Sequence, residues 1–187
     1  AAHIEGKGCA TMNQTGLAQK FGPVVSHLRI AQQQKDINAV RIAAGDADLL
    51  LACDLVVGSS DEAIAKVNVE RSHAVVNSAQ LNTSELLENV DLNFPQQKMM
   101  ETLKQEVGQH KVAFINATEL AVQLLGDTLA SNLFLMGYAY QQGLIPVSAA
   151  AINQAIAVNN VAVEFNQQAF VWGRRAAVDS DAVYQAA

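Results

Sequence analysis

The stretch from Thr15 to Arg29 combines residue types whose chemistry suits recognition of a ligand or a partner. Its glycines and proline shape a loop that leads into Val24–Ile30, whose alternating pattern is typical of a β-strand. Ligands of α/β proteins bind beyond the carboxyl ends of strands, so this loop would present a cationic side chain at an open edge. The candidate ligand- or partner-facing residues are Thr15, Gly16, Gln19, Lys20, Ser26, His27 and Arg29.

A plainer interpretation of the same stretch is a solvated connection followed by the outer face of a strand. Both interpretations put His27 and Arg29 on the wetter face of that strand, because Leu28 and Ile30 alternate onto the other face. Spacing alone does not distinguish the two interpretations, and both stay open at this point.

Other patterns associated with chemistry are incomplete in this sequence. Gly6-Lys7-Gly8 lacks the Ser or Thr that would hold Mg²⁺ in a phosphate-binding loop. The four histidines lie far apart without the spacing of paired ligands, so we expect no metal site. Two cysteines are too few for an iron–sulfur cluster, and the apolar context of Cys53 favours a buried, unreactive thiol. Asp46 and Asp48 more readily begin a helix than form an acid–base pair.

The composition narrows the possible functions further. Of the 187 residues, 50% are apolar, which excludes a disordered chain. The net charge of −6 argues against nucleic-acid binding, which needs a basic face. We expect no membrane span and, without a secretory signal, a cytoplasmic location. Asn and Gln together number 30, as many as the charged residues. One interpretation is that part of this amide-rich surface is buried against another domain or subunit, because interface cores are depleted in charge. The other is that the composition is a bias without functional meaning.

Periodicity predicts strands separated by helices up to Ile115. Because the run Leu55–Val57 is apolar on both faces, we expect a buried strand at Asp54–Gly58, preceded by a helical turn. Ser59 and Glu62 have the spacing of a capping box that would open the next helix. The expected strands are Gly8–Met12, Val24–Ile30, Val40–Ile42, Asp54–Gly58, His73–Asn77 and Lys111–Ile115.

Helices account for the rest of the chain. One is expected at Pro95–Val107, before the last strand, and another begins at Asn116 as its cap and ends at Gly126. Apolar residues at helical spacing predict three more up to Arg174. The predicted fold class is α/β, as three α/β/α layers, with a largely parallel or mixed sheet in the first part and helices in the C-terminal third.

The run Thr15–Ile30, with the sequence TGLAQKFGPVVSHLRI, resembles the segment TGLAQKGGAVxSHxRI of the indolepyruvate ferredoxin oxidoreductases. The likeness continues in order and covers nearly the whole chain. The matching part of those enzymes is the gamma domain, also called the catalytic domain of the pyruvate ferredoxin/flavodoxin oxidoreductase group, within the 2-oxoacid:acceptor oxidoreductases. Further matching segments are Ala44–Val57, Val75–Ser78, Asn132–Gly137, Gly143–Ser148 and Asn160–Arg174.

The resemblance implies one domain of a larger thiamine-diphosphate enzyme. Such enzymes oxidatively decarboxylate an aryl 2-oxoacid, pass electrons through iron–sulfur clusters to ferredoxin, and transfer the acyl group to coenzyme A. The thiamine-binding and iron–sulfur domains or subunits would be partners of this chain, which is expected to bind no cofactor and to be inactive alone. Residues 1–178 would form a single gamma-type domain that lacks the family's first strand and glycine-rich turn, with a tail or linker at 179–187.

Two departures from the family pattern limit what the resemblance implies for the loop. Phe21 and Pro23 replace a glycine and an alanine, which adds bulk and removes a backbone N–H. The candidate residues therefore carry over only as interface or ligand-edge residues, without a catalytic role. One alternative is a free-standing module that binds a small anion or a coenzyme A-like ligand. Another is the equivalent domain of a pyruvate or branched 2-oxoacid oxidoreductase.

Overall fold

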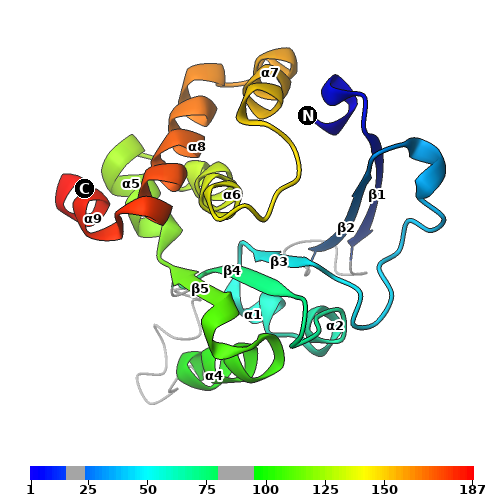
Figure 1. Cartoon of the computed structure of the whole chain (residues 1–187). Coiled ribbons are helices and arrows are strands. Elements are labelled where there is room, and N and C mark those ends of the chain that lie inside the picture. Colours follow the sequence, from blue (N-terminus) through cyan, green and yellow to red (C-terminus); the bar gives the residue numbers. More distant parts are fainter. Residues whose placement is uncertain (16–23, 80–94) are drawn as a thin grey trace.

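A parallel three-stranded sheet lies at the centre of the computed structural model (Figure 1). The structure describes residues 1–15, 24–79 and 95–187, and of Gln14 and Thr15 it describes the backbone alone. The strands lie in the order β3-β4-β5, and helical segments connect them because parallel neighbours require a crossover. Their bounds are β3 Leu49–Ala52, β4 His73–Asn77 and β5 Val112–Ile115.

Side chains that alternate along β4 supply the core on both faces of the sheet. Ala74 and Val76 pack with Leu103 of helix α4 on one face. Val75 points to the other face and packs with Leu120 of helix α5. Both faces are covered, as Figure 1 shows, so the three central positions of the strand are all apolar and buried. The first face carries α1 Leu55–Gly58, α2 Asp61–Ile64 and α4 Gln96–Val107. The predicted α/β fold class is confirmed.

The C-terminal helices cover the second face, and two of them approach each other unusually closely. A Cβ atom on Gly173 of α8 would lie 1.8 Å from the carbonyl oxygen of Phe134 in α6. A Cβ atom on Gly137 of α6 would lie 2.1 Å from the carbonyl oxygen of Phe170. Only glycine permits this contact. The bounds are α5 Ala117–Leu125, α6 Ser131–Gln141, α7 Ala149–Asn159, α8 Val163–Val178 and α9 Ser180–Ala186.

An antiparallel ribbon of β1 (Gly8–Thr15) and β2 (Val24–Ala31) forms a second, separate sheet. Cys9 lies opposite Ile30, and both contact the apolar cluster that α6, α7 and α8 build. Figure 1 shows the ribbon beside the β3 edge of the parallel sheet. Periodicity predicts both strands, but not that they pair only with each other.

The predicted order of elements within Asp48–Gly58 is wrong. The strand β3 comes first and the helix α1 follows it. The side chain of Asp54 accepts a hydrogen bond from the N–H of Val57 at 2.8 Å, which caps the helix where a strand was expected. The next helix, α2, is capped by Ser60 rather than by Ser59. The first error arises in a short apolar run, whose periodicity does not separate a strand from one helical turn. The second arises because two serines in succession precede the helix, and either can cap it.

One other segment differs from expectation. Val40–Ile42 is irregular, so the predicted strand is wrong; the N–H of Ile42 donates to the side chain of His27 instead of to a strand. Residues 179–187 carry helix α9, whose Val183 is buried; the role of this segment as a tail or linker stays a prediction. Among the described residues, no helix is both long and apolar enough to cross a membrane.

Candidate functional site

The loop that the sequence singles out lies largely outside the described residues. This holds for Gly16, Gln19 and Lys20, while Thr15 is described as the last backbone position of β1. Ser26 is exposed on β2, and its hydroxyl donates a hydrogen bond to the Oδ1 atom of Asn13 across the ribbon at 2.9 Å. The structure therefore tests the strand part of the prediction and not the loop part.

His27 is buried, with 2% of its surface exposed, so its predicted place on the wetter face is wrong. The opposite face is the open one, because Leu28 is 53% exposed. The Nδ1 atom of His27 accepts a hydrogen bond from the N–H of Ile42 at 3.0 Å, and its Nε2 atom has no partner among the described residues. Burial lowers the pKa of this imidazole, and the charges of Lys66 and Arg41 lower it further.

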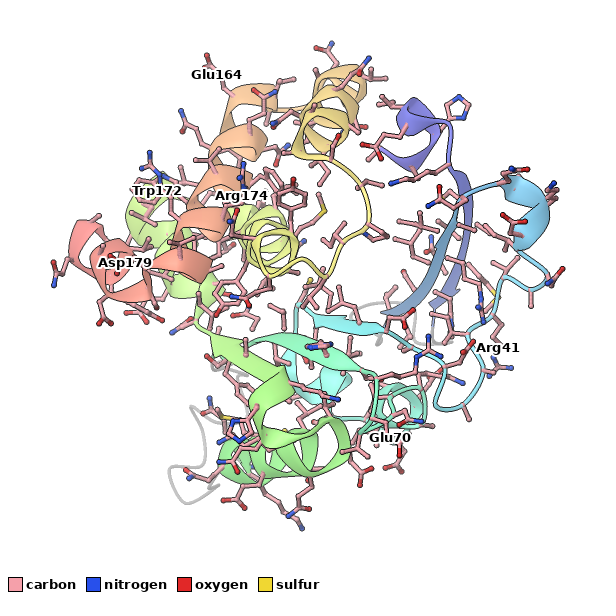
Figure 2. The ribbon with its side chains drawn as sticks, in the orientation of Figure 1. Arg41, Glu70, Glu164, Trp172, Arg174 and Asp179 are labelled. Atoms are coloured by element: carbon pink, nitrogen blue, oxygen red, sulfur yellow. The ribbon has the colours of Figure 1, made fainter. Side chains whose placement is uncertain are left out.

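Arg29 takes part in an ion-pair cluster that holds the ribbon to the body of the domain. Its Nη2 atom donates to Asp46 at 2.9 Å and to the carbonyl oxygen of Arg41 at 3.2 Å; Figure 2 shows Arg41 on the connection between ribbon and sheet. Arg71 pairs with Asp46 at 3.0 Å and also with Asp48. The hydrogen bond from Arg29 lowers the pKa of Asp46. The two aspartates therefore clamp loops together and do not begin a helix as expected.

Asn77, at the carboxyl end of β4, joins the ends of all three parallel strands. Its Nδ2 atom donates to the carbonyl oxygen of Cys53 after β3 at 3.1 Å, and to the hydroxyl of Thr118 in α5 at 2.8 Å. Its Oδ1 atom accepts from the N–H groups of Ala117 at 3.1 Å and Ala79 at 3.3 Å. This residue is not among the candidates predicted from the sequence. The available signal was a polar residue at the end of a strand with an apolar centre, where α/β proteins place their ligand-binding edge.

An open pocket of about 560 Å³ lies beside this edge. Gln96 donates to the carbonyl oxygen of Ser78 at 2.9 Å, which joins helix α4 to the end of β4. Asn116 caps helix α5 and donates to the carboxylate of Glu119 at 2.6 Å. The lining residues that the structure describes offer amides, hydroxyls and a carboxylate and include no cation, so they suit hydrogen bonding to a neutral polar group. The lining residues are Ser78, Ala79, Gln96, Asn116, Thr118, Glu119, Val122 and Gln123.

Cys53 lies at the same edge and is exposed, so the predicted burial of this residue is wrong. The surrounding protein nevertheless desolvates the sulfur, and this desolvation, together with the charge of Asp54, raises the pKa of the thiol. A raised pKa keeps the thiol protonated at neutral pH, which is the less reactive form.

The fold defines a class of domain in which helices cover both faces of a parallel sheet. The polar side chains described at the edge of this sheet can bind other groups through hydrogen bonds, but they do not form an acid–base pair or triad. A family model described as pyruvate ferredoxin/flavodoxin oxidoreductase matches residues 1–176, and the chain belongs to this family.

Two other known proteins are similar to this chain. The "Pyruvate/ketoisovalerate oxidoreductases common subunit gamma" of Pyrococcus furiosus is 26% identical over 161 residues, which cover 83% of this chain and 72% of that protein. The crystal structure of a keto/oxoacid ferredoxin oxidoreductase gamma subunit from Geobacter sulfurreducens PCA has a similar fold, with a TM-score of 0.60 and 18% identity. That match covers 95% of this chain and 85% of the other. The predicted family is confirmed; these relatives do not single out the indolepyruvate branch.

Proposed function

We propose that this chain is the gamma-type domain of a 2-oxoacid ferredoxin oxidoreductase, where it supports oxidative decarboxylation without carrying the reacting groups. The family match over residues 1–176 carries this proposal. The relative from Pyrococcus furiosus supports it, because that protein is a gamma subunit. The described residues support it too, since their polar side chains at the sheet edge are engaged in capping and in joining strands.

The described residues of this chain do not fit thiamine diphosphate. A bound diphosphate needs a divalent cation and its oxygen ligands, or a cationic cradle. Within the described ranges, no group of three or more His, Cys, Asp or Glu side chains could hold a metal ion. The pocket at the carboxyl edge carries Glu119, which repels phosphate. We therefore assign the thiamine and the iron–sulfur clusters to partner domains or subunits, and no chemical step to this chain.

Two substrate classes compete for this domain. The run Thr15–Ile30 resembles the indolepyruvate enzymes, which favours an aryl 2-oxoacid. The relative from Pyrococcus furiosus is named for pyruvate and ketoisovalerate, which supports the equivalent domain of such an enzyme equally well. Either reaction would yield an acyl-CoA and reduced ferredoxin.

The proposal can be tested by measuring how fast the intact oxidoreductase that contains this chain reduces an electron-accepting dye when a 2-oxoacid is supplied. With coenzyme A present, we expect turnover with indolepyruvate, pyruvate or 3-methyl-2-oxobutanoate, and the preferred substrate identifies the branch. The isolated chain, supplied with thiamine diphosphate and Mg²⁺, should show no turnover. Turnover by the isolated chain would overturn the proposal, and so would an intact complex that is inactive with every 2-oxoacid.

Apart from the buried His27 and the ion-paired Arg29, the Thr15–Arg29 edge is proposed to face a partner or an anionic ligand in that complex. The change Lys20→Ala should then lower the activity of the intact enzyme while leaving its Tm nearly unchanged, since exposed charges add little stability. Lys98→Ala, at an exposed position on α4, is the matched control. A lower Tm with unchanged specific activity would instead support the solvated connection.

A free-standing binding module remains the competing function. Calorimetric titration of the isolated chain with coenzyme A and with inorganic phosphate distinguishes it from a dependent domain. Binding tighter than about 1 mM, which corresponds to about 4 kcal/mol, would favour the module. No heat of binding would favour the dependent domain.

The outer edge of β3 supports the expectation that a further strand completes the sheet. Among the described strands only β4 pairs with it. Leu49 and Leu51 contact the core on one face and Leu50 contacts the core on the other, a pattern typical of an inner strand. An open apolar edge invites another strand. Backbone amides of β3 should therefore exchange with deuterium more slowly in the intact oxidoreductase than in the isolated chain, and equal exchange would contradict this.

A further inference from the structure

A long uncharged stretch supplies one exposed face of the domain. No Asp, Glu, Lys, Arg or His occurs in the 36 residues between Asp127 and Glu164, although the chain as a whole carries a net charge of −6. Much of α6 is buried or half-buried, whereas the outer side of α7 and the turn that follows it form an exposed part of this stretch. The exposed residues there include Ala150, Gln154, Ala157, Val158 and Val161.

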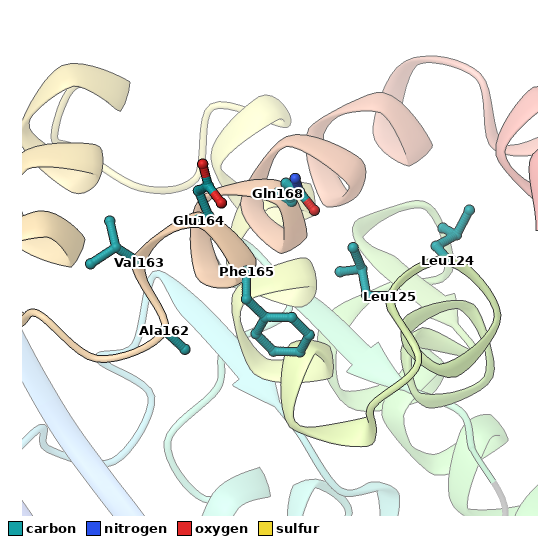
Figure 3. Close-up of a pocket in the computed structure, with 7 residues that line it drawn as sticks. All are labelled: Leu124, Leu125, Ala162, Val163, Glu164, Phe165 and Gln168. Carbon is teal, nitrogen blue, oxygen red and sulfur yellow. The ribbon is translucent and has the colours of Figure 1, made fainter.

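An open groove of about 670 Å³ adjoins that turn, between the end of α5 and the start of α8, and its lining combines Leu124, Leu125 and Phe165 with Glu164 and Gln168. Figure 3 shows the ring of Phe165 facing Leu125 there, with the carboxylate of Glu164 pointing away from the ring. Leu129, in the short helix η4 (Thr128–Ala130) that follows α5, is 71% exposed. Val158 and Val161 are 75% and 62% exposed. All three of these exposed aliphatic side chains lie within the uncharged stretch.

Hydrogen bonding and backbone conformation constrain the main chain of the turn between α7 and α8, which carries the exposed Val161. Asn160 and Ala162 have φ angles of 53° and 43°, a left-handed conformation that non-glycine residues rarely adopt. Asn166 of α8 donates from Nδ2 to the carbonyl oxygen of Val161 between them, at 2.9 Å. A contact residue that is ordered before binding loses less conformational entropy when a partner covers it.

We propose that this α7–α8 face, formed by the exposed side of α7, the Asn160–Ala162 turn and the adjoining groove, docks permanently onto a neighbouring subunit or domain of the oxidoreductase. The inference rests on the proposed function and specifies where the partner binds. The partner surface must itself be uncharged, with apolar side chains that fill the groove beside Phe165 and with amides or hydroxyls opposite Gln154.

Charge distinguishes this occupant from two others. A transient partner is recognised largely through charged groups, which speed encounter, and the groove of this face offers one charged side chain, Glu164. A second copy of the chain would bring another net charge of −6, which opposes self-association outside the contact itself. Cores of lasting interfaces are apolar and depleted in charge, as this face is.

The test compares Val161→Asp with Val178→Asp in the intact oxidoreductase. Val178 is 74% exposed at the far end of α8, outside the proposed face, so it is a matched control. We expect Val161→Asp to lower the recovery of the complex in size-exclusion chromatography at least tenfold, and Val178→Asp to leave it unchanged. Equal melting temperatures of the isolated variant chains would show that both fold. Hydrogen exchange should show protection of residues 124–129 and 157–168 in the complex.

The outcomes separate the two hypotheses. If Val161→Asp assembles like the unchanged chain and the face stays unprotected, the docking surface is wrong while the proposed function stands. If the complex forms through this face but turns over no 2-oxoacid, the proposed function fails and the surface stands. If sedimentation shows a dimer of the isolated chain that Val161→Asp dissociates, the occupant is a second copy, and the proposal is overturned.

Discussion

Replacing Asn77 by alanine removes four hydrogen bonds that hold the carboxyl edge of the sheet together. The amide is 5% exposed, and it reaches the end of β3 through Cys53 and the start of α5 through Thr118 and Ala117. Alanine fills less space and offers neither a donor nor an acceptor. The partner groups must then find water or stay unpaired.

The expected cost follows from those partners. A hydrogen bond within a protein contributes about 0.5–1.5 kcal/mol net, and a buried group left without a partner costs about 1–3 kcal/mol. The N–H of Ala117 is buried, so it bears the larger cost, whereas the 3.3 Å bond to Ala79 is the weakest of the four. We expect a loss of about 3–4 kcal/mol in the free energy of unfolding, a large share of the total of about 5–15 kcal/mol for a domain.

Urea unfolding followed by circular dichroism measures this loss. The m-value should stay constant while the midpoint falls. Asn132→Ala, at an exposed position of α6, is the control and should change the stability by less than about 0.5 kcal/mol. A loss of less than about 1 kcal/mol for Asn77→Ala would refute the reasoning, because it would mean that water replaces the amide without cost.

Three further predictions concern the core and the ribbon. Gly173→Ala places a Cβ atom 1.8 Å from the carbonyl oxygen of Phe134. In thermal unfolding this change should lower the free energy of unfolding by about 3 kcal/mol, and unchanged stability would contradict the close helix contact. His27 has a folded-state pKa below its ordinary value of 6.5, so stability should be complete above that pH and fall as the pH drops through the folded-state pKa. In urea titrations at about pH 7.5 and about pH 5.5, His27→Gln should abolish this dependence, and a persisting slope would assign it to another group. Trp172 is half-buried, and the guanidinium of Arg175 lies 4.9 Å from its ring centre. Trp172→Ala should lower the free energy of unfolding by about 2 kcal/mol, and the fluorescence of Trp172 should shift to longer wavelength on unfolding. Emission typical of free tryptophan in the folded chain would contradict this packing.

Local signals in the sequence predict several elements well. The strand His73–Asn77 is confirmed at its predicted bounds, because an apolar run of that length between polar turns has one obvious interpretation. Helix α5 begins at its predicted cap, Asn116, and ends at Gly126, since both ends depend on hydrogen bonds within a few residues. The four-residue elements α1 and β3 exchange places relative to the prediction, because each is too short for its period to be read.

The candidate site is harder to predict, because its residues gain their roles from distant neighbours. Alternation correctly puts His27 and Arg29 on one face of β2. Which face is buried depends on the irregular loop at Val40–Ile42, which covers it. Asn77 acquires its importance only when the ends of β3 and α5 converge on it.

The sequence by itself determined the alternation of strands and helices, the family, and the concentration of uncharged residues between Asp127 and Glu164. These properties reside in residue order and composition, so no contact is needed to recognise them. The tertiary structure alone decided that His27 is buried, that the aspartates near β3 clamp the ribbon, and that the uncharged stretch leaves Val161 exposed beside a groove. Burial and ion pairing depend on which segments meet in space, and segments far apart along the chain meet only when the whole domain folds.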